Sequence, residues 1–295
     1  MSGSTTGNQA PNWGTKGIAA ASNDPGGRQG MQSWQDASGN LYVFGGSTLG
    51  FEYVLCNDMW KYDISTLQWT WLGGPSTCNL GPFPITSAAY ASWELTAGNQ
   101  AVFGTLGTAA STNIPANRRA AATWVDASGK FWMFGGIGYD NLGNANLWSD
   151  LWRYDPSTGF WTWMGGPNTP NQSGVYGTQG TGSTSNYPGG RQEMAYWADA
   201  AGNFWLFGGQ SGGSYFNDLW KYNVTSGQWT WVSGSNTANA TAVYGTQGTA
   251  AAGNVPNARK GTVGWVDSTG KLWLFGGDGI DAGGGLGTLG DLWKY

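Results

Sequence analysis

Among the side chains that could carry out chemistry, one type is missing altogether. None of the 295 residues is histidine. This absence excludes mechanisms and metal centres that depend on imidazole as a base, a proton shuttle or a ligand. The two cysteines, Cys56 and Cys78, are too few to hold a zinc ion by themselves. Catalysis would therefore depend on carboxylates, tyrosine, arginine, or a hydroxyl or thiol acting without histidine.

Seven of the 17 carboxylates lie outside the repeated pattern described below. Of these, Glu52, Glu94 and Asp140 lie in connections, where two carboxyls about 5–10 Å apart could act on a polysaccharide. Asp278 and Asp281 are calcium candidates by composition only, because no EF-hand spacing accompanies them. The other ten carboxylates recur at turns and strand ends, where hydrogen bonding to the backbone is the simpler explanation.

Arginine recurs at a fixed position. Four arginines each precede the first glycine of a Gly-Gly doublet by 17 residues, and they are Arg28, Arg118, Arg191 and Arg259. Arg119 follows the second of them. Such a guanidinium could contact a ligand, or could hydrogen-bond the loop carbonyls of its own repeat. The recurrence favours the second role, because a structural role repeats and a binding role need not.

An internal repeat positions these residues. Four copies align, at Pro25–Gly74, Pro115–Gly166, Pro188–Gly234 and Pro256–Tyr295. Each has an arginine, a tryptophan before an Asp-Ala-Ser-Gly-like turn, a Gly-Gly doublet and a run similar to Asp-Leu-Trp-Lys-Tyr. The first three continue into Trp-Thr-Trp. These segments predict four short strands per copy, here called a to d, with glycine supplying positive φ in the a–b turn.

The Gly-Gly doublet that ends strand b, the Asn57-Asp58-Met59-Trp60 run and the pair Tyr62 and Trp69 look like a kelch motif. The sequence resembles the kelch-repeat β-propellers, including the bacterial secreted kind and the propeller of galactose oxidase. The resemblance implies an all-β fold, a kelch-type β-propeller of four-stranded antiparallel blades. We expect four repeats, the last lacking its outer strand, in a single domain over 1–295. The approximate repeats are 1–74, 75–166, 167–234 and 235–295.

The chain departs from the kelch pattern in two ways. Its copies are about 70 residues long against roughly 50 in the family, and they are fewer than in most kelch domains. Galactose-oxidase chemistry is excluded because its copper site requires histidine, so we expect no cofactor.

Composition agrees with an all-β protein. The sequence contains 52 Gly and 20 Trp with only 10% charged residues, which is typical of strands joined by tight turns. A net charge of -4 argues against a nucleic-acid partner, which would require clustered Lys and Arg. The apolar runs are too short for a membrane span.

Loop lengths indicate where a ligand would bind. The a–b and c–d connections keep one length, whereas the b–c connections measure 12, 14, 9 and 14 residues and the d–a connections also vary. Because strands alternate in direction, these variable connections should share one face, with the arginines at its inner rim. Trp93 and Trp148 have no counterparts in other copies and lie in these connections. They could stack on a ligand, or could be buried under a long loop.

We therefore expect a non-catalytic binding scaffold that recognises carbohydrate or protein through the variable face. One alternative is a polysaccharide-acting enzyme that uses loop carboxylates, and another is a purely structural segment of a longer repetitive surface protein. The candidate ligand-binding residues are Arg28, Arg118, Arg119, Arg191, Arg259, Trp93 and Trp148.

Cys56 and Cys78 have no counterparts in the other copies, which predicts that they form a disulfide. A disulfide in turn predicts an extracellular or cell-surface location. The fourth copy has no Trp-Thr-Trp strand, so we expect strand c of that copy to have an open edge. Such edges recruit another strand or self-associate.

Overall fold

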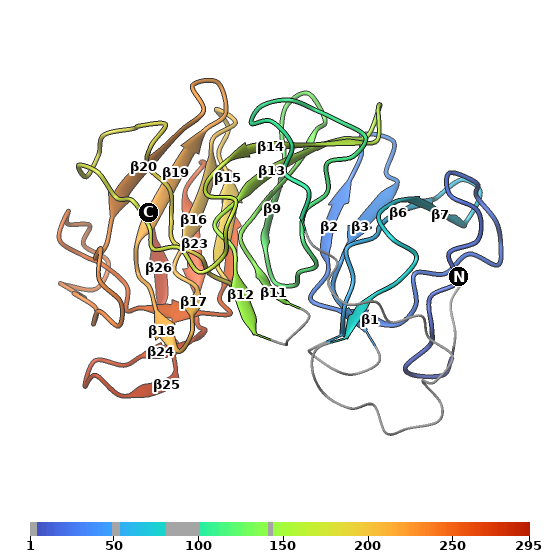
Figure 1. Ribbon diagram of the computed structural model, residues 1–295. Helices are drawn as coiled ribbons and strands as arrows, with labels where there is room; N and C mark the ends of the chain where they lie inside the picture. The colour runs from blue at the N-terminus through green and yellow to red at the C-terminus, as the bar shows by residue number, and fades with distance from the viewer. Residues whose placement is uncertain (1–4, 49–53, 81–100, 141–143) are drawn as a thin grey trace. The chain divides into compact units, whose positions relative to one another are not determined.

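The computed structural model describes residues 5–48, 54–80, 101–140 and 144–295, and these form strands, turns and loops without a helix (Figure 1). The predicted all-β class is confirmed. The chain divides into two compact units, Met1–Asn146 with Asp150–Asn168, and Leu147–Ser149 with Thr169–Tyr295. The single domain expected over 1–295 stays a prediction.

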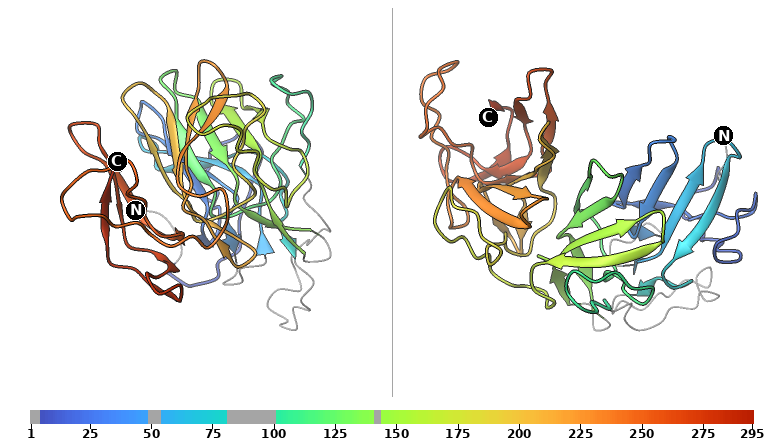
Figure 2. Two further views of the ribbon diagram at one scale, coloured as in Figure 1. Left: turned by 90° about the vertical axis from the view of Figure 1, so that its left-hand side faces the viewer. Right: turned by 90° about the horizontal axis from the view of Figure 1, so that it is seen from above.

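In the first unit, strands a to d of each of the first two copies form a four-stranded antiparallel sheet (Figures 1 and 2). Within each sheet the strands lie in chain order. The first sheet consists of β2 (Gln32–Gln35), β3 (Leu41–Phe44), β6 (Met59–Asp63) and β7 (Gln68–Gly73). The second consists of β9 (Ala122–Val125), β10 (Phe131–Phe134), β13 (Leu151–Asp155) and β14 (Phe160–Gly165).

In the second unit, strands a to d of the third copy form a four-stranded antiparallel sheet, and strands a to c of the fourth copy form a three-stranded one. The third sheet consists of β15 (Ala195–Ala198), β16 (Phe204–Phe207), β19 (Leu219–Asn223) and β20 (Gln228–Ser233). The fourth consists of β22 (Val263–Val266), β23 (Leu272–Phe275) and β26 (Leu292–Lys294). Within the described residues, the fourth copy thus provides strands a, b and c and no strand d.

The b–c connections form further small sheets, some of them together with residues before strand a or after strand d. In the first copy these strands are β1 (Arg28–Gln29), β4 (Ser47–Thr48), β5 (Val54–Leu55) and β8 (Asn79–Leu80), and in the second copy they are β11 (Ile137–Tyr139) and β12 (Ala145–Leu147). In the second unit they are β17 (Gln210–Ser211) with β18 (Ser214–Tyr215), and β21 (Arg259–Lys260), β24 (Asp278–Ile280) and β25 (Leu286–Thr288). Because the residues before strand a pair with these hairpins, the d–a and b–c connections of a copy lie side by side.

The a–b turns show why an aspartate recurs before glycine. Asp126 Oδ1 accepts hydrogen bonds from the backbone N–H of Ser128 at 2.9 Å and of Lys130 at 3.1 Å, and its Oδ2 accepts one from Trp132 Nε1 at 2.8 Å. Burial raises the pKa of this carboxyl, but the hydrogen bonds outweigh burial and lower it below its usual value. The aspartate therefore works as an ionised turn residue.

Adjacent sheets within a unit pack through aromatic rings. Trp34 of the first sheet stacks on Phe131 of the second, with ring centroids 5.6 Å apart, and its Nε1 donates to the Trp132 carbonyl at 3.0 Å. In the second unit, Trp197 donates to the Trp273 carbonyl at 3.1 Å. Within each unit, the strand-a tryptophan of one sheet thus bonds a carbonyl of the other sheet, and in the first unit it also stacks on a ring of that sheet.

In the first three copies, a segment that precedes the ion-pair arginine covers the free edge of strand d of the same copy. We call these segments edge loops. They span residues 13–24, 103–114 and 176–187, and the equivalent segment of the fourth copy spans residues 244–255. In the third copy, the backbone N–H groups of Gly180 and Ser183 donate to the carbonyls of Trp231 at 2.8 Å and Trp229 at 3.1 Å. The Asn186 side chain also donates to the Trp229 carbonyl, at 3.3 Å. A sheet edge that would otherwise be open is thereby hydrogen-bonded.

A glycine is required inside the edge loop. Gly177 has φ +62°, and a Cβ atom there would lie 2.5 Å from Asn186 Oδ1. The loop can close around its asparagine only because this residue has no side chain.

Phe131 tests the packing between the first two sheets. Its ring is fully buried, so Phe131→Ala should lower the free energy of unfolding by about 3–5 kcal/mol through lost burial and a cavity. Phe160 lies in the same unit but is 36% exposed, so Phe160→Ala should cost about 0.5 kcal/mol or less. Urea unfolding followed by tryptophan fluorescence measures both. Equal losses would contradict the packing described.

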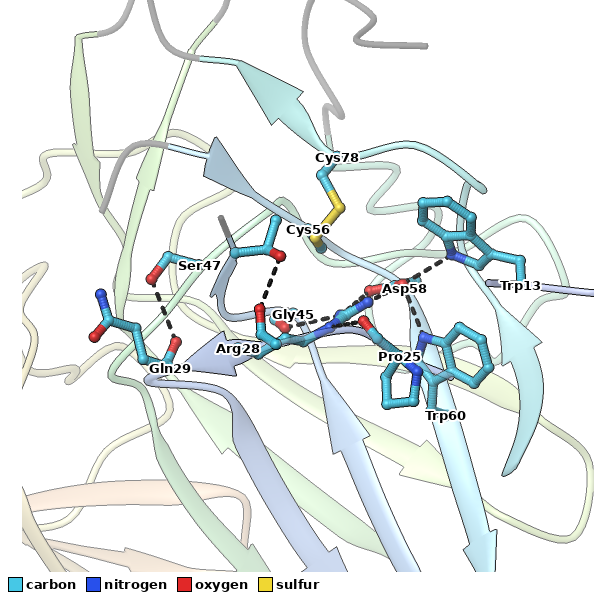
Figure 3. Close-up of a disulfide and its surroundings, with 12 residues drawn as sticks. Trp13, Pro25, Arg28, Gln29, Gly45, Ser47, Cys56, Asp58, Trp60 and Cys78 are labelled. Atoms are coloured by element: carbon cyan, nitrogen blue, oxygen red, sulfur yellow. Dashed lines mark hydrogen bonds and ion pairs between the residues drawn. A yellow bond between two sulfur atoms is a disulfide. The ribbon is translucent and has the colours of Figure 1, made fainter. Parts of the chain in front are cut away.

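The predicted disulfide between Cys56 and Cys78 is confirmed, with Cα atoms 4.3 Å apart. It lies where β5 pairs with β8, and Val54 and Trp13 pack around it (Figure 3). The bond therefore fastens the b–c connection of the first copy to the start of the following d–a connection.

The double substitution Cys56→Ser and Cys78→Ser should lower the free energy of unfolding by about 2–4 kcal/mol. The reason is that the bond restricts a segment with a sequence separation of 22 in the unfolded chain. Urea unfolding of the oxidised protein and of the double variant measures the loss, and the reduced wild-type protein is the control that should match the variant. Unchanged stability in the variant would show that the bond does not constrain the unfolded chain.

Candidate binding face

A buried ion pair lies at the base of each b–c connection. In the second copy, Arg118 Nη1 and Nη2 donate to the two carboxylate oxygens of Asp150 at 2.6 and 2.8 Å. Nη1 also donates to the Gly135 carbonyl at 2.9 Å. Both side chains of the ion pair are 0% exposed. The planar guanidinium matches the carboxylate with two parallel bonds, so its position is fixed in direction as well as distance.

The other copies repeat this arrangement, and Figure 3 shows it for Arg28, Asp58 and Gly45 beside the disulfide. The equivalent pairs are Arg28–Asp58, Arg191–Asp218 and Arg259–Asp291. In each, Nη1 bonds the carbonyl of the glycine 17 residues later. The fixed spacing of 17 residues in the sequence therefore reflects this hydrogen bond between the arginine side chain and the first glycine of the doublet.

The aspartate of each pair accepts further hydrogen bonds from aromatic residues. Asp218 Oδ2 accepts one from Trp220 Nε1 at 2.8 Å and one from the Tyr176 hydroxyl at 2.7 Å. Burial, followed by the charge of Asp218, raises the pKa of Tyr176. The hydroxyl consequently keeps its proton and remains a donor, which helps to compensate the carboxylate for its loss of water.

The four repeated arginines thus take the structural role that their recurrence favoured. Their side chains are 0% exposed and are bonded to carboxylate and carbonyl oxygens, so they present no donor to a ligand in this structure. Among the five candidate arginines, Arg119 differs, because it lies one position later and is only half-buried.

The position after the buried arginine is the one that changes chemically between copies. These side chains, which we call the rim residues, are Gln29, Arg119, Gln192 and Lys260. They pair through the backbone with the b–c hairpins and remain exposed or half-buried. The sequence analysis identified only Arg119 among them. The other three could have been identified in the same way, because each is a variable residue directly after a repeated arginine.

The residue after each rim residue has a left-handed backbone. The φ values are 65° at Gly30, 56° at Ala120, 57° at Glu193 and 62° at Gly261. Ala120 N–H donates to the Gly30 carbonyl at 2.8 Å, and Gly261 N–H donates to the Glu193 carbonyl at 3.0 Å. These bonds join neighbouring copies within each unit and hold a conformation that is costly for Ala120 and Glu193. The rim residues are consequently on a fixed backbone.

The two tryptophan candidates have different outcomes. Trp148 is 6% exposed, and its carbonyl accepts a hydrogen bond from the Arg191 N–H at 3.2 Å. Burial, the alternative left open by the sequence, is therefore what the structure shows. Trp93 lies outside the described residues.

The loop carboxylates that the structure describes hydrogen-bond within their own hairpins. Asp140 accepts hydrogen bonds from the backbone N–H and side-chain amide of Asn144, at 2.8 and 2.9 Å. Asp281 accepts two backbone N–H bonds in its own turn, and Asp278 accepts the Thr288 hydroxyl at 2.9 Å. Glu52 and Glu94 lie outside the described residues.

The described residues contain neither a cluster of metal ligands nor a helix that could span a membrane. Across residues 5–48, 54–80, 101–140 and 144–295, no group of three His, Cys, Asp or Glu side chains is placed to hold a metal ion. In the same part of the chain, no helix has the length and apolar character needed to cross a bilayer.

Comparison with known proteins gives a structural likeness only. No family model matches the sequence, and no curated protein matches it. A solved structure described as "Structure of YjhT" is similar, with a TM-score of 0.50 and 18% sequence identity. The match covers 88% of this chain and 62% of that one, so the chain spans less than two thirds of that protein's length. At this identity the likeness concerns the fold alone.

Asp291 provides a test of the ion pairs. Burial raises its pKa, but hydrogen bonds from Arg259 and Trp293 and the charge of Arg259 outweigh burial, so its pKa lies at about 2. The unfolded value is about 3.9. A pKa lowered by folding stabilises the protein above the unfolded value, and this contribution is lost as the pH falls from about 4 towards 2.

Asp291→Asn should therefore be destabilising at pH 6. The difference from wild type should shrink as the pH falls from about 4 towards 2, because the unfolded wild-type chain then binds a proton at Asp291 that the folded protein binds only at lower pH. Urea unfolding at pH 6, 5, 4 and 3 measures the difference. A difference that does not change over this range would show that the carboxylate charge contributes nothing.

Proposed function

We propose that this chain is a non-catalytic binding scaffold, a four-repeat kelch-type β-propeller that binds carbohydrate or protein through its b–c and d–a connections. The observation that carries the proposal is that each copy combines a repeated buried residue with a variable residue at the surface. The repeated arginine side chain is fully buried in equivalent contacts in all four copies, whereas the rim residue beside it differs between copies and is exposed or half-buried. Variable groups on a rigid frame are typical of binding sites.

The rim residues have the chemistry for such a ligand. Amide and cationic side chains hydrogen-bond the hydroxyl and carboxylate oxygens that glycans and protein surfaces present. In the second unit, Lys260 Nζ lies 3.2 Å from Glu193 Oε2, and both side chains are partly exposed. A hollow of about 270 Å³ lies just beyond them and is lined by Met194, Ala195, Tyr196, Thr262 and Gly264. Together these groups provide polar contacts beside a concave surface.

We propose an extracellular or cell-surface location for the scaffold. The disulfide supports this, because such bonds persist in oxidising compartments. The enzymatic alternative has less support, since Asp140 closes a turn rather than facing a second carboxylate of known position.

A glycan array and a protein-ligand screen identify the ligand class, and calorimetry then measures the variants. Arg119→Ala and Lys260→Ala should each weaken binding about tenfold, the value of one charge-assisted hydrogen bond, and should leave the unfolding midpoint nearly unchanged. Lys16→Ala is the matched control, because Lys16 is an exposed lysine of an edge loop. Wild-type affinity in both rim variants would refute the rim as the site. Turnover of any polysaccharide would favour the enzymatic alternative.

A further inference from the structure

Glu193 has an unusual side chain for its backbone position. The residue after each rim residue has a left-handed backbone, and the other copies have Gly30, Ala120 and Gly261 there. Glycine adopts this conformation without strain, whereas a Cβ atom makes it costly. Among these four residues, Glu193 alone combines the strain with an ionisable group. Strained backbone of this kind clusters at ligand-binding and catalytic sites.

The carboxylate of Glu193 reaches the next copy. Its Oε2 lies 3.2 Å from Nζ of Lys260, the rim residue of the fourth copy. It also lies beside Gly261, where a Cβ atom would be 3.8 Å away. The Glu193 carbonyl accepts a hydrogen bond from the Gly261 N–H at 3.0 Å. The backbone and the side chain of Glu193 thus both join the third copy to the fourth, and they place an anion against the rim cation.

Stability alone does not account for this pair. The side chains of Glu193 and Lys260 are 28% and 22% exposed, and an ion pair accessible to water contributes little to folding because solvent screens it. The left-handed backbone of Glu193 costs at least as much as such a pair contributes. Glycine would avoid that cost, and it is present at this position in the first and fourth copies. The structure thus favours a role for Glu193 outside folding.

The pair has the chemistry of a binding site for hydroxyl groups. A carboxylate accepts hydrogen bonds from hydroxyl groups, an ammonium donates to hydroxyl oxygens, and bonds with a charged partner are stronger than neutral ones. The amide of Gln192, the other rim residue of the second unit, both donates and accepts. Met194 and Thr262, which line the hollow of about 270 Å³, directly follow Glu193 and Gly261 in the chain. A sugar ring in this hollow would therefore have these polar groups at its edge.

The same pair disfavours an anionic ligand. A ligand carboxylate that approached Lys260 Nζ would also come close to Glu193 Oε2, and like charges repel at such distances. It would in addition have to compete with Glu193 for the ammonium. An uncharged ligand meets neither cost, because its hydroxyl groups can bond both members of the pair. Glu193 is thereby placed to set the charge preference of the second unit.

We propose that Glu193 is a specificity-determining residue, and that the rim of the second unit, with Gln192, Lys260 and the hollow beside them, binds an uncharged carbohydrate. This inference rests on the binding function proposed above and deepens it by naming the ligand class. The hydroxyl groups of the sugar bond the Glu193 carboxylate and the Lys260 ammonium, which remain paired with each other. In this unit, Glu193 excludes uronic acids and other carboxylate-bearing sugars by repulsion.

A glycan array that carries neutral and carboxylate-bearing oligosaccharides tests the charge preference. Its probes include β-1,4-linked hexasaccharides of glucose and mannose beside those of glucuronic and mannuronic acid. In Glu193→Gly, apparent affinity for the neutral glycans should fall about tenfold, the value of one charge-assisted hydrogen bond. Affinity for the acidic glycans should rise several-fold, because Lys260 is released. Arg119 is the same in both proteins, so its own contribution to acidic binding cancels in the comparison.

Two further variants separate binding from folding. Glu193→Gln keeps the size of the side chain without its charge, and it should retain more neutral binding than Glu193→Gly while admitting the acidic glycans. Leu67→Gly is the matched control for strain, because Leu67 has φ 59° in the turn between β6 and β7 and is 56% exposed. It removes the same kind of strain outside the rim and should leave both affinities unchanged. Neither glycine variant should lower the unfolding midpoint.

Two outcomes would overturn the proposal. The first is a ratio of acidic to neutral affinity that is the same in Glu193→Gly and in the wild-type protein. The second is the absence of binding to every neutral glycan on the array. In the second case the binding scaffold proposed above would still stand if Arg119→Ala and Lys260→Ala weakened the binding of a protein ligand.

Discussion

The buried ion pair between arginine and aspartate is the interaction on which each copy depends. A guanidinium and a carboxylate removed from water are expensive, and a buried pair adds little net stability by itself. What it provides is direction. The arginine of each copy fixes the carboxylate that precedes strand c and the carbonyl at the end of strand b, and the aspartate orients the indole two residues later. Removing one partner would leave an uncompensated charge, which costs about 3–5 kcal/mol.

The aromatic side chains connect whole sheets and loops, whereas the ion pair orients groups within one copy. Within each unit, the strand-a tryptophan of one sheet joins that sheet to the other, and the tryptophans of strand d hold the edge loop through their carbonyls. Both roles use indoles at strand positions, but one uses the ring and the other the backbone. Most of the repeated tryptophans therefore have structural roles, whereas the four rim residues are polar or charged.

Much of the framework was predictable because the repeat aligns residues that have the same structural role in each copy. Recurrence predicted the strands of each copy, the Asp-Gly turns and the structural role of the arginines. The Cys56–Cys78 bond was predicted because neither cysteine has a counterpart in the other copies. The predicted propeller, its function and its ligand stay predictions. The partner of each arginine was not predicted, because it lies 27 to 32 residues away, beyond a loop of changing length. Trp148 was equally undecidable, since a residue without counterparts gives no pattern from which to infer burial.

The ion pair also sets what the b–c connections can become. Because the arginine binds Gly135 at one end of the connection and Asp150 at the other, the two ends are held together by a group outside the loop. Lengthening such a loop costs only closure entropy, and going from 9 to 14 residues costs about 0.4 kcal/mol. The segment between these two residues is therefore nearly free to accept insertions. In evolution or in engineering, a new hairpin can therefore be inserted into the b–c connection of each copy while the sheets remain intact.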